Sequence, residues 1–577
     1  MHLTTERMVI KLAFSKNLID ANSYFSTYKS DLERPRSRFD RSSSIKTSFN
    51  VGDLVPFYVD EVLPGDTFDV ETSFVTRLQT LITPPMDDLF LDMYYFFVPS
   101  RLCWTHWKEF MGESTSSWTS DVEYQVPQLT FSKSDKTVLQ KSLLDYFGVP
   151  INPDGVLSIS RLPINAYNLI WNEWFRDENL QDEVLVDIDD GNVEFDKNNS
   201  AKGGKLLKVN KLHDYFTSAL PQPQKGEDVT ISSIFGDIPV VTRDKVTMTG
   251  KHPAVSLVNV NGFPISDGKY RSMYAASNIP RLPSRPESYT TLNFGTTETS
   301  LDSQIADDSG IYFNNLYADP SASDPLTVNS LRLAFATQQM LETDARSGSR
   351  YIELLRGHFG VISPDGRLQR PELLSANRTR INVHQIVQQS ESGQTPLGTT
   401  AAMSLTSNTD NSFTKSFTEH GYVIGVMCAR YNHTYQQGLQ RMWSRKNRLD
   451  YYFPILANIG EQPIYSREIY YENDGFGSLD NVFGYQEAWA DYRYKTSIVT
   501  GEMRSGITNS LQSWHFADYY TKKPTLSSTW IQEDKTNVDR TLAVTSALAD
   551  QIFGDFYVKN LTTRVMPVHS IPGLHTL

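Results

Sequence analysis

Residues 89–98 read LFLDMYYFFV and are apolar at almost every position. A run this short and this continuously apolar is typical of a strand buried on both faces of a β-sandwich. Residues 422–429, YVIGVMCA, have the same character and predict a second buried strand. We therefore expect a sheet that is covered on both sides.

Just before the first of these runs, residues 68–82 alternate between apolar and polar side chains. The apolar positions of one parity are Phe68, Val70, Phe74, Leu78 and Ile82. Alternation with a period of two predicts a half-buried strand. Shorter strands are expected at 449–453, 464–471 and 553–558.

Helices are expected to be few. Apolar side chains at three-to-four spacing predict helices at 165–177 and 331–345. Ser347-Gly348 interrupts the second helix, which resumes at 351–355 and ends at Gly357, and a short helix is expected through Trp104, Trp107 and Phe110. Because strands and helices do not alternate, a doubly wound α/β fold is disfavoured, and a mainly β sandwich with long insertions fits better.

The 577 residues divide into four parts by composition. Residues 1–50 are polar, rich in Ser and Arg, and are expected to form an extended arm, with regular structure beginning near Val51. Residues 51–225 and 329–577 carry the predicted strands. Residues 226–328 lack a persistent period and are rich in Pro, Gly, Ser, Asn and Asp, which predicts a long functional insertion.

The composition limits the classes of protein that this chain can belong to. Hydrophobic residues at 39% and charged residues at 21% allow a packed core, and an aromatic content of 12% favours an all-β or assembly protein. The net charge of −13 means that any nucleic-acid contact is local or shared with a basic partner. Cys103 and Cys428 lie in apolar runs, which predicts buried free thiols and a reducing compartment. No apolar stretch of membrane-spanning length and no signal-peptide pattern is present, so folding in a cytoplasm without membrane insertion is expected.

Motifs for catalysis or cofactor binding are missing from the sequence. It contains no phosphate-binding GxxxxGK[ST] loop, no HExxH pair and no GxSxG elbow. The 11 histidines are scattered, and each is expected to be structural rather than a metal ligand or catalytic base. The adjacent carboxylates Asp87 and Asp88 are expected in a turn. We predict no catalytic, cofactor-binding or metal-binding residues and no enzymatic activity.

Two basic stretches are the candidate contact sites. The first contains Arg34, Arg36, Arg38, Arg41 and Lys46, and the second contains Arg441, Arg445, Lys446 and Arg448. Both include an aromatic residue, Phe39 and Trp443 respectively. Lys and Arg neutralise phosphates and aromatic rings stack on unpaired bases, so single-stranded DNA is one candidate ligand. Contact with a neighbouring subunit is the equally open alternative.

Several long segments are shared in sequence and in order with one family. They are FDRSSSIKTSFNVGDLVPFYVDEVLPGDTF (39–68), PPMDDLFLDMYYFFVPSRL (84–102), KLHDYFTSALPQPQKG (211–226), ARSGSRYIELLRGHFGV (345–361), DGRLQRPELL (365–374), FGYQEAWADYRYKTSIVTGEMRS (483–505) and RVMPVHSIPGL (564–574). Together they resemble the microvirus major capsid protein of small single-stranded DNA bacteriophages, closest to its gokushovirus branch. The resemblance spans nearly the whole chain.

This resemblance implies an eight-stranded antiparallel jelly-roll β-sandwich with long loop insertions. It implies a homo-oligomeric T=1 icosahedral shell around a circular single-stranded DNA genome, assembled in the bacterial host cytoplasm and residing in the virion. Residues 226–328 are expected to form a protrusion at the three-fold axis that is available for host attachment. The implied partners are a small basic DNA-binding phage protein, scaffolding and pilot proteins, and a receptor on the host surface.

Two other classes of protein share parts of this pattern. A phage spike or receptor-binding protein also combines β-structure with long loops, but the chain lacks the sequence repeats of many spike shafts. A carbohydrate-active enzyme on a β-sandwich needs two converging carboxylates, and no spacing here selects such a pair.

Overall fold

The computed structural model describes residues 36–113, 123–132, 136–151, 155–227, 328–387, 400–472 and 481–569, together with 229, 240–242, 257–258, 312–313, 316–318 and 389. The chain divides into a main unit, Met1–Pro223 with Ala345–Leu577, and an inserted unit, Gln224–Asp344. The expected insertion at 226–328 falls inside the inserted unit, and most of its residues lie outside the described residues.

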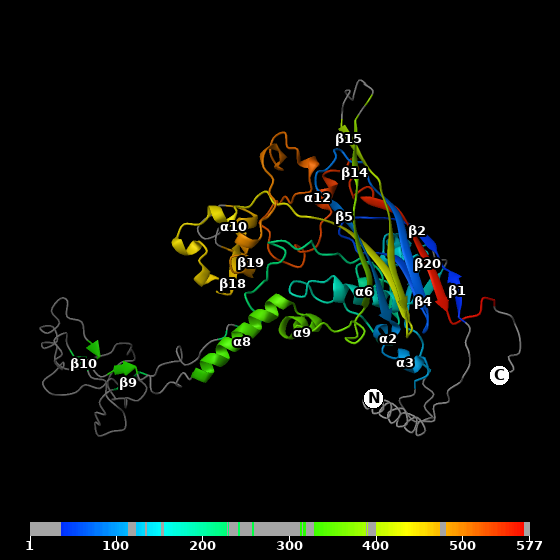
Figure 1. Ribbon diagram of the computed structural model, residues 1–577, viewed down its shortest axis with the longest axis horizontal. Helices are drawn as coiled ribbons and strands as arrows, with labels where there is room; N and C mark the ends of the chain where they lie inside the picture. The colour runs from blue at the N-terminus through cyan, green and yellow to red at the C-terminus, as the bar shows by residue number, and fades with distance from the viewer. Residues whose placement is uncertain are drawn as a thin grey trace, which may run out of the picture. The chain divides into compact units, whose positions relative to one another are not determined.

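Two antiparallel sheets form the centre of the main unit (Figure 1). In the first sheet, β20 pairs with both β1 and β2 along one side and with β4 along the other. The next strand, β16, pairs with the far side of β4. Its strands are β1 (Ser37–Asp40), β2 (Ser43–Phe49), β4 (Thr67–Leu78), β16 (Thr406–Ser416) and β20 (Ile552–Arg564). The second sheet has the order β13-β5-β17-β3. Its strands are β3 (Val55–Val62), β5 (Leu89–Pro99), β13 (Glu372–Arg380) and β17 (Gly421–Tyr431).

The two apolar runs form β5 and β17, the central pair of the second sheet, and both are buried on both faces as predicted. Tyr95 and Phe97 of β5 belong to the core between the two sheets, where the Tyr95 hydroxyl lies 2.7 Å from the Thr72 hydroxyl of β4. Phe96 and Val98 point the other way, into a second core. Successive side chains of a strand alternate between faces, so burial on both faces favours a nearly continuous apolar run, which in β5 is interrupted only by the ion-paired Asp92.

The alternating segment forms β4, and the prediction is confirmed up to Leu78. Phe68 and Phe74 are at most 2% exposed on the inner face. Ile82 was wrongly assigned to this face, because the strand ends at Leu78 and Leu81 turns inward instead. Leu81 is 2% exposed and Ile82 is 48% exposed.

A layer of short elements covers the outer face of the second sheet. Its helices are α2 (Ser100–Cys103), α3 (Trp107–Phe110), α4 (Lys136–Leu139), α5 (Leu143–Tyr146) and α6 (Leu162–Trp174). Its strands are β6 (Gln128–Ser132), β7 (Val156–Ser160) and β8 (Val193–Glu194), with a 3-10 turn η2 (Ser200–Lys202). The helix expected at 165–177 is α6, which begins earlier because Pro163 suits a first turn. The single helix expected through Trp104 is instead two helices, because Trp104 is extended.

The structure corrects the expectation that regular structure begins near Val51. Both β1 and β2 lie within the predicted arm and pair with β20, and Phe49 is fully buried. The outward positions of β2 are Ser and Lys, so its sequence lacks the apolar density of a core strand. Residues 1–35 of the arm lie outside the described residues.

The connection between β17 and β20 contains short elements. They are β18 (Glu461–Tyr465), β19 (Val482–Glu487), α10 (Ser466–Ile469), α11 (Ala490–Arg493), α12 (Thr536–Asp539), η5 (Arg441–Trp443), η6 (Arg448–Asp450), η7 (Pro454–Leu456), η9 (Gly501–Met503) and η10 (Gln512–Trp514). The strand expected at 449–453 is wrong, since η6 and irregular chain lie there. The strand expected at 464–471 is correct only for its start, because α10 follows Tyr465. The strand expected at 553–558 lies within β20.

The remaining elements connect β5 to β16. They are β9 (Val240–Thr242), β10 (Leu257–Val258), β11 (Tyr312–Phe313), β12 (Leu316–Ala318), α8 (Val328–Ser347), α9 (Tyr351–Phe359), β14 (Val383–Val387) and β15 (Thr400–Ser404). The helical pattern and its interruption at Ser347-Gly348 are confirmed by α8 and α9. Gly357 does not end α9, which continues to Phe359. Gly360, with a φ of +67°, ends it in the left-handed conformation that favours glycine.

Candidate functional site

The first predicted basic stretch lies on β1 and β2, and in the residues directly beside them, at the edge of the first sheet. Arg34 lies outside the described residues. The other four side chains contact oxygens of the same chain: Arg36 contacts the Thr67 hydroxyl (3.1 Å), Arg38 contacts Asp69 (3.4 Å), Arg41 contacts Asp60 (2.5 Å) and Lys46 contacts Asp555 (2.9 Å). These contacts fasten β1 and β2 to neighbouring strands. A contact with DNA or with another subunit stays a prediction for this stretch.

The outer face of the first sheet is open over β2, β20, β4 and β16. A hollow on this face is lined by small polar side chains, by Val75, by the ion pair of Lys46 with Asp555, by Arg77, and by two half-exposed aromatic residues, Phe553 and Tyr557. Arg77 has no ion-pair partner among the described residues. The sheet therefore presents a polar face with aromatic rings, which is an arrangement that single-stranded nucleic acid binds.

The second predicted basic stretch divides into two kinds of residue. Arg441 pairs with Glu468 at 3.3 Å, and Arg445 pairs with Asp491. Both arginine side chains are largely buried, so their charges are used inside the main unit. Lys446 and Arg448 are exposed, and Arg448 lies 5.3 Å from the centre of the Phe453 ring. Only these two of the four cations are directed to solvent.

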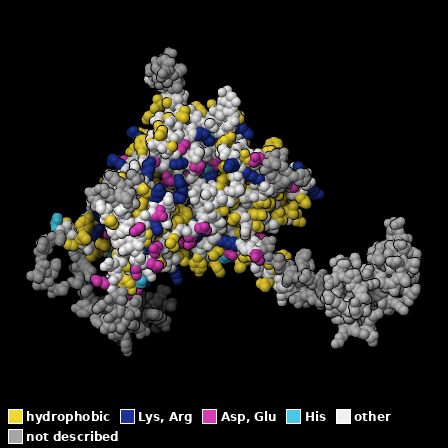
Figure 2. Space-filling model, turned by 180° about the vertical axis from the view of Figure 1, so that it is seen from behind, with side chains coloured by type: hydrophobic (Ala, Val, Ile, Leu, Met, Phe, Trp, Pro, Cys, Tyr) yellow, Lys and Arg dark blue, Asp and Glu magenta, His cyan; other side chains and the backbone are white. Residues whose placement is uncertain are grey.

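Large exposed apolar side chains lie in the same segment as these two cations. Trp443 is 70% exposed, Leu449 is 72% exposed and Ile455 is 90% exposed. Tyr492 and Tyr494 of the neighbouring segment are also half exposed. Figure 2 shows hydrophobic side chains gathered at the edge of the main unit that carries β18 and β19. We name residues 442–455 with Tyr492 and Tyr494 the aromatic–basic surface.

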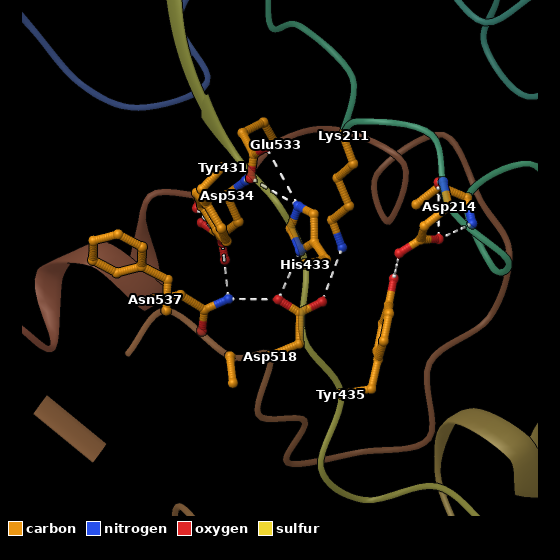
Figure 3. Close-up of polar contacts among 12 residues, drawn as sticks. Lys211, Asp214, Tyr431, His433, Tyr435, Asp518, Glu533, Asp534 and Asn537 are labelled. Carbon is orange, nitrogen blue, oxygen red and sulfur yellow. Dashed lines mark hydrogen bonds and ion pairs between the residues drawn. The ribbon is translucent and has the colours of Figure 1, made fainter. Parts of the chain in front are cut away.

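A buried charged network holds the chain that leads into this surface (Figure 3). His433 follows β17, and its two ring nitrogens lie 2.9 Å from Asp518 and 3.2 Å from Glu533. All three side chains are at most 3% exposed. Burial alone would lower the pKa of His433, but the two carboxylates outweigh burial and raise that pKa to about 10. His433 is therefore a charged structural residue with both N–H groups bonded.

The same carboxylate of Asp518 is shared with a second cation. Lys211 lies 3.5 Å from Asp518 and 4.4 Å from the centre of the Trp530 ring. Burial would raise the pKa of Asp518, but His433 and Lys211 lower it well below its ordinary value. Two cations thus balance two carboxylates in the interior. The sequence could not identify this network, because Lys211, His433 and the two carboxylates come from segments that are far apart in the sequence.

Further hydrogen bonds fix the next residues of this segment. The Tyr435 hydroxyl donates to Asp214 at 2.6 Å. The Gln437 side chain donates to the Tyr520 carbonyl at 2.8 Å and accepts from the Tyr520 amide at 2.7 Å. The chain is therefore held up to Gln437, four residues before η5 begins, and the aromatic–basic surface follows from this fixed point.

Comparison with known proteins identifies the family. A family described as "Capsid protein (F protein)" matches residues 29–574. Capsid protein VP1 of Chlamydia phage 1 is 40% identical over 94% of this chain and 96% of its own length. Capsid protein VP1 of Bdellovibrio phage phiMH2K is 38% identical (93% and 95%), and that of Spiroplasma virus 4 is 37% identical (96% and 98%). The chain belongs to this capsid protein family.

Membership in the capsid protein family confirms the resemblance to microvirus major capsid proteins of the gokushovirus type. The chain has a structural role in the virion, where capsid proteins act as assembled oligomers, and it is not an enzyme. No helix among the described residues has the length and apolar character needed to cross a membrane. The described residues also contain no group of three or more His, Cys, Asp or Glu side chains arranged to hold a metal ion.

Proposed function

We propose that this capsid protein folds as an eight-stranded jelly roll and builds a T=1 icosahedral shell around circular single-stranded DNA. The observation that carries the proposal is the order of strand pairing. The eight long strands, in chain order, are β2, β3, β4, β5, β13, β16, β17 and β20. One sheet contains the first, eighth, third and sixth, and the other contains the second, seventh, fourth and fifth. Two interlocked Greek keys of this kind define the jelly roll of many viral shells.

The lengths of the connections support a role in assembly. The chain between β5 and β13 and the chain between β17 and β20 contain a large part of all residues. Neither is needed to complete the two sheets, and both present exposed aromatic side chains. A compact sandwich that tiles a closed surface needs such loops to fill the spaces between copies.

For the packaged DNA, the open outer face of the first sheet is the favoured contact. It offers Arg77 and two aromatic rings, with Lys46 paired to Asp555 beside them, and β1 pairs with β20 in the same sheet. Because the chain has a net charge of −13, the remaining phosphate charge falls to a small basic DNA-binding phage protein. Scaffolding and pilot proteins complete the partners in the bacterial cytoplasm.

The inserted unit is the candidate for the three-fold protrusion and for attachment to the host receptor. Residues 224–344 form a unit distinct from the main unit, which supports this assignment. Deleting residues 226–328 is expected to leave shells that assemble but adsorb poorly to host cells. Normal adsorption of such shells would remove the attachment role.

The proposed shell is tested by producing the full chain with its companion phage proteins and imaging the product by electron microscopy. Uniform small icosahedral particles containing nuclease-protected circular single-stranded DNA are expected. Folded protein that remains monomeric or trimeric with all partners present would contradict the proposal. The DNA contact is tested by Arg77→Glu with Tyr557→Ser, which should lower DNA per particle while Lys205→Glu, an exposed control, does not.

A further inference from the structure

The aromatic–basic surface has the composition of a protein interface. Such interfaces are rich in aromatic residues, Met and Arg, and a monomer rarely exposes so many large apolar side chains together. Leu449 and Ile455 are aliphatic and cannot stack on nucleotide bases. Arg441 and Arg445 are already paired with carboxylates of the same chain. These features favour a protein partner over DNA.

The main unit also contains a surface of opposite character. Residues 182–190 read DEVLVDIDD and contain five carboxylates. This segment has neither helix nor strand, and it exposes Leu185 by 74% and Ile188 by 41%. Asp182 and Asp189 are exposed and have no side-chain ion pair among the described residues. We name residues 182–190 the acidic strip.

Buried polar side chains hold the backbone of the acidic strip in place. Asn172 of α6 bonds both the amide and the carbonyl of Val184, at 2.9 and 2.7 Å. The fully buried Arg161 donates to the carbonyls of Asp187 and Asp189 at 2.7 and 2.8 Å. An extended segment fixed in this way loses little entropy when a partner docks on it.

We propose that the aromatic–basic surface of one copy docks on the acidic strip of a second copy. The two surfaces are complementary, since each exposes large apolar side chains, and the exposed charges beside them are Lys446 and Arg448 on one surface and Asp182 and Asp189 on the other. The contact joins two different surfaces of identical chains, and contacts of this head-to-tail kind close into rings when the rotation allows. The inference rests on the proposed shell and assigns one of its interfaces.

The test uses charge reversal in the full chain, produced as for the shell. Lys446→Glu with Arg448→Glu, and separately Asp182→Lys with Asp189→Lys, should each lower particle yield by at least about tenfold. All four changes together should restore the yield, because attraction returns with the signs exchanged. The control is Lys197→Glu with Lys205→Glu, which changes the net charge as much as the Lys446 and Arg448 variant does but at other exposed positions. This control should leave the yield unchanged.

A second pair of variants tests the apolar centres without changing charge. Leu449→Ser and Leu185→Ser each replace a side chain that is more than 70% exposed, so folding should be retained. Both should lower particle yield, and circular dichroism verifies that each variant is folded.

The outcomes separate the inference from the proposed shell. If the unmodified chain forms no particles, the shell proposal fails. If it forms particles but the reversed variants do so equally well, or the fourfold variant is not restored, the docking inference is overturned. Normal particle yield with reduced DNA content in the Lys446 and Arg448 variant would assign the surface to nucleic acid instead and would equally overturn it.

Discussion

Replacing His433 with Phe should strongly destabilise the main unit. Phe keeps the ring that packs 4.6 Å from the Tyr431 ring, but it removes both N–H donors and the positive charge. Asp518 would then keep only Lys211, at 3.5 Å, as a cationic partner, and Glu533 would lose its contact with a cation. Breaking a buried ion pair by removing one partner costs about 3–5 kcal/mol.

The pKa of His433 gives a second estimate of the same interaction. A rise from 6.5 to about 10 corresponds to about 5 kcal/mol in favour of the charged form, at about 1.4 kcal/mol per unit. Because the folded-state pKa is raised, this stabilisation is complete below about pH 6.5 and is lost as pH rises through about 10. Burial raises the pKa of Tyr431 and of Tyr520 well above 10, so these groups stay neutral in that interval.

The measurement is urea unfolding followed by tryptophan fluorescence, because Trp530 lies beside Lys211 in the network. The free energy of unfolding should fall by about 3–5 kcal/mol in His433→Phe at pH 6.5. The gap to the unmodified protein should narrow steadily up to about pH 10. His384→Phe, at an exposed position of β14, is the control and should change the free energy by less than about 0.5 kcal/mol. A loss below about 1 kcal/mol, or a gap independent of pH, would refute a charged His433.

Two further predictions concern the second sheet and α2, the helix that follows β5. Asp92 is 1% exposed and accepts hydrogen bonds from Arg378 at 2.6 Å and from Arg430 at 2.9 Å. Asp92→Asn should therefore lower the free energy of unfolding by about 3–5 kcal/mol. An unchanged thermal midpoint of unfolding would contradict this prediction. Burial raises the pKa of the Cys103 and Cys428 thiols to about 12. Neither thiol should therefore react with a thiol reagent at pH 8 until the protein is unfolded. Rapid reaction of the native protein would contradict the burial of these side chains.

The sequence predicted two kinds of strand well. In one kind both faces are apolar, and in the other apolar and polar residues alternate regularly. In β5 and β17 both faces are apolar, and in β4 apolar and polar positions alternate up to Leu78. In these cases burial alone determines the residue type at each position. The pattern is therefore visible without knowledge of the neighbouring strands.

Prediction from the sequence was wrong where the same residue type can serve either a core or a surface. Residues 449–453 read LDYYF, which resembles a strand, yet Leu449 and Tyr451 are exposed on the aromatic–basic surface. Apolar side chains destined for a contact between chains look the same in sequence as those of a core. The opposite error occurred in β2, whose outward face meets solvent in the single chain and is therefore polar. Hydrophobic pattern cannot separate these cases, because it does not state what covers a residue.

The basic stretches show the same difficulty for charge. The sequence places Arg36, Arg38 and Arg41 close together, which suggests a free positive cluster. The structure puts a hydroxyl or a carboxylate of a distant strand against each of them, as with Arg41 and Asp60 at 2.5 Å. Charge reversal at Arg41 would therefore disturb the edge of the first sheet, and its effect could not be assigned to the loss of a ligand contact. Arg77 and Lys446 are exposed and have no such partner among the described residues, so they are better probes, because a change in DNA content or particle yield can then be assigned to the contact itself.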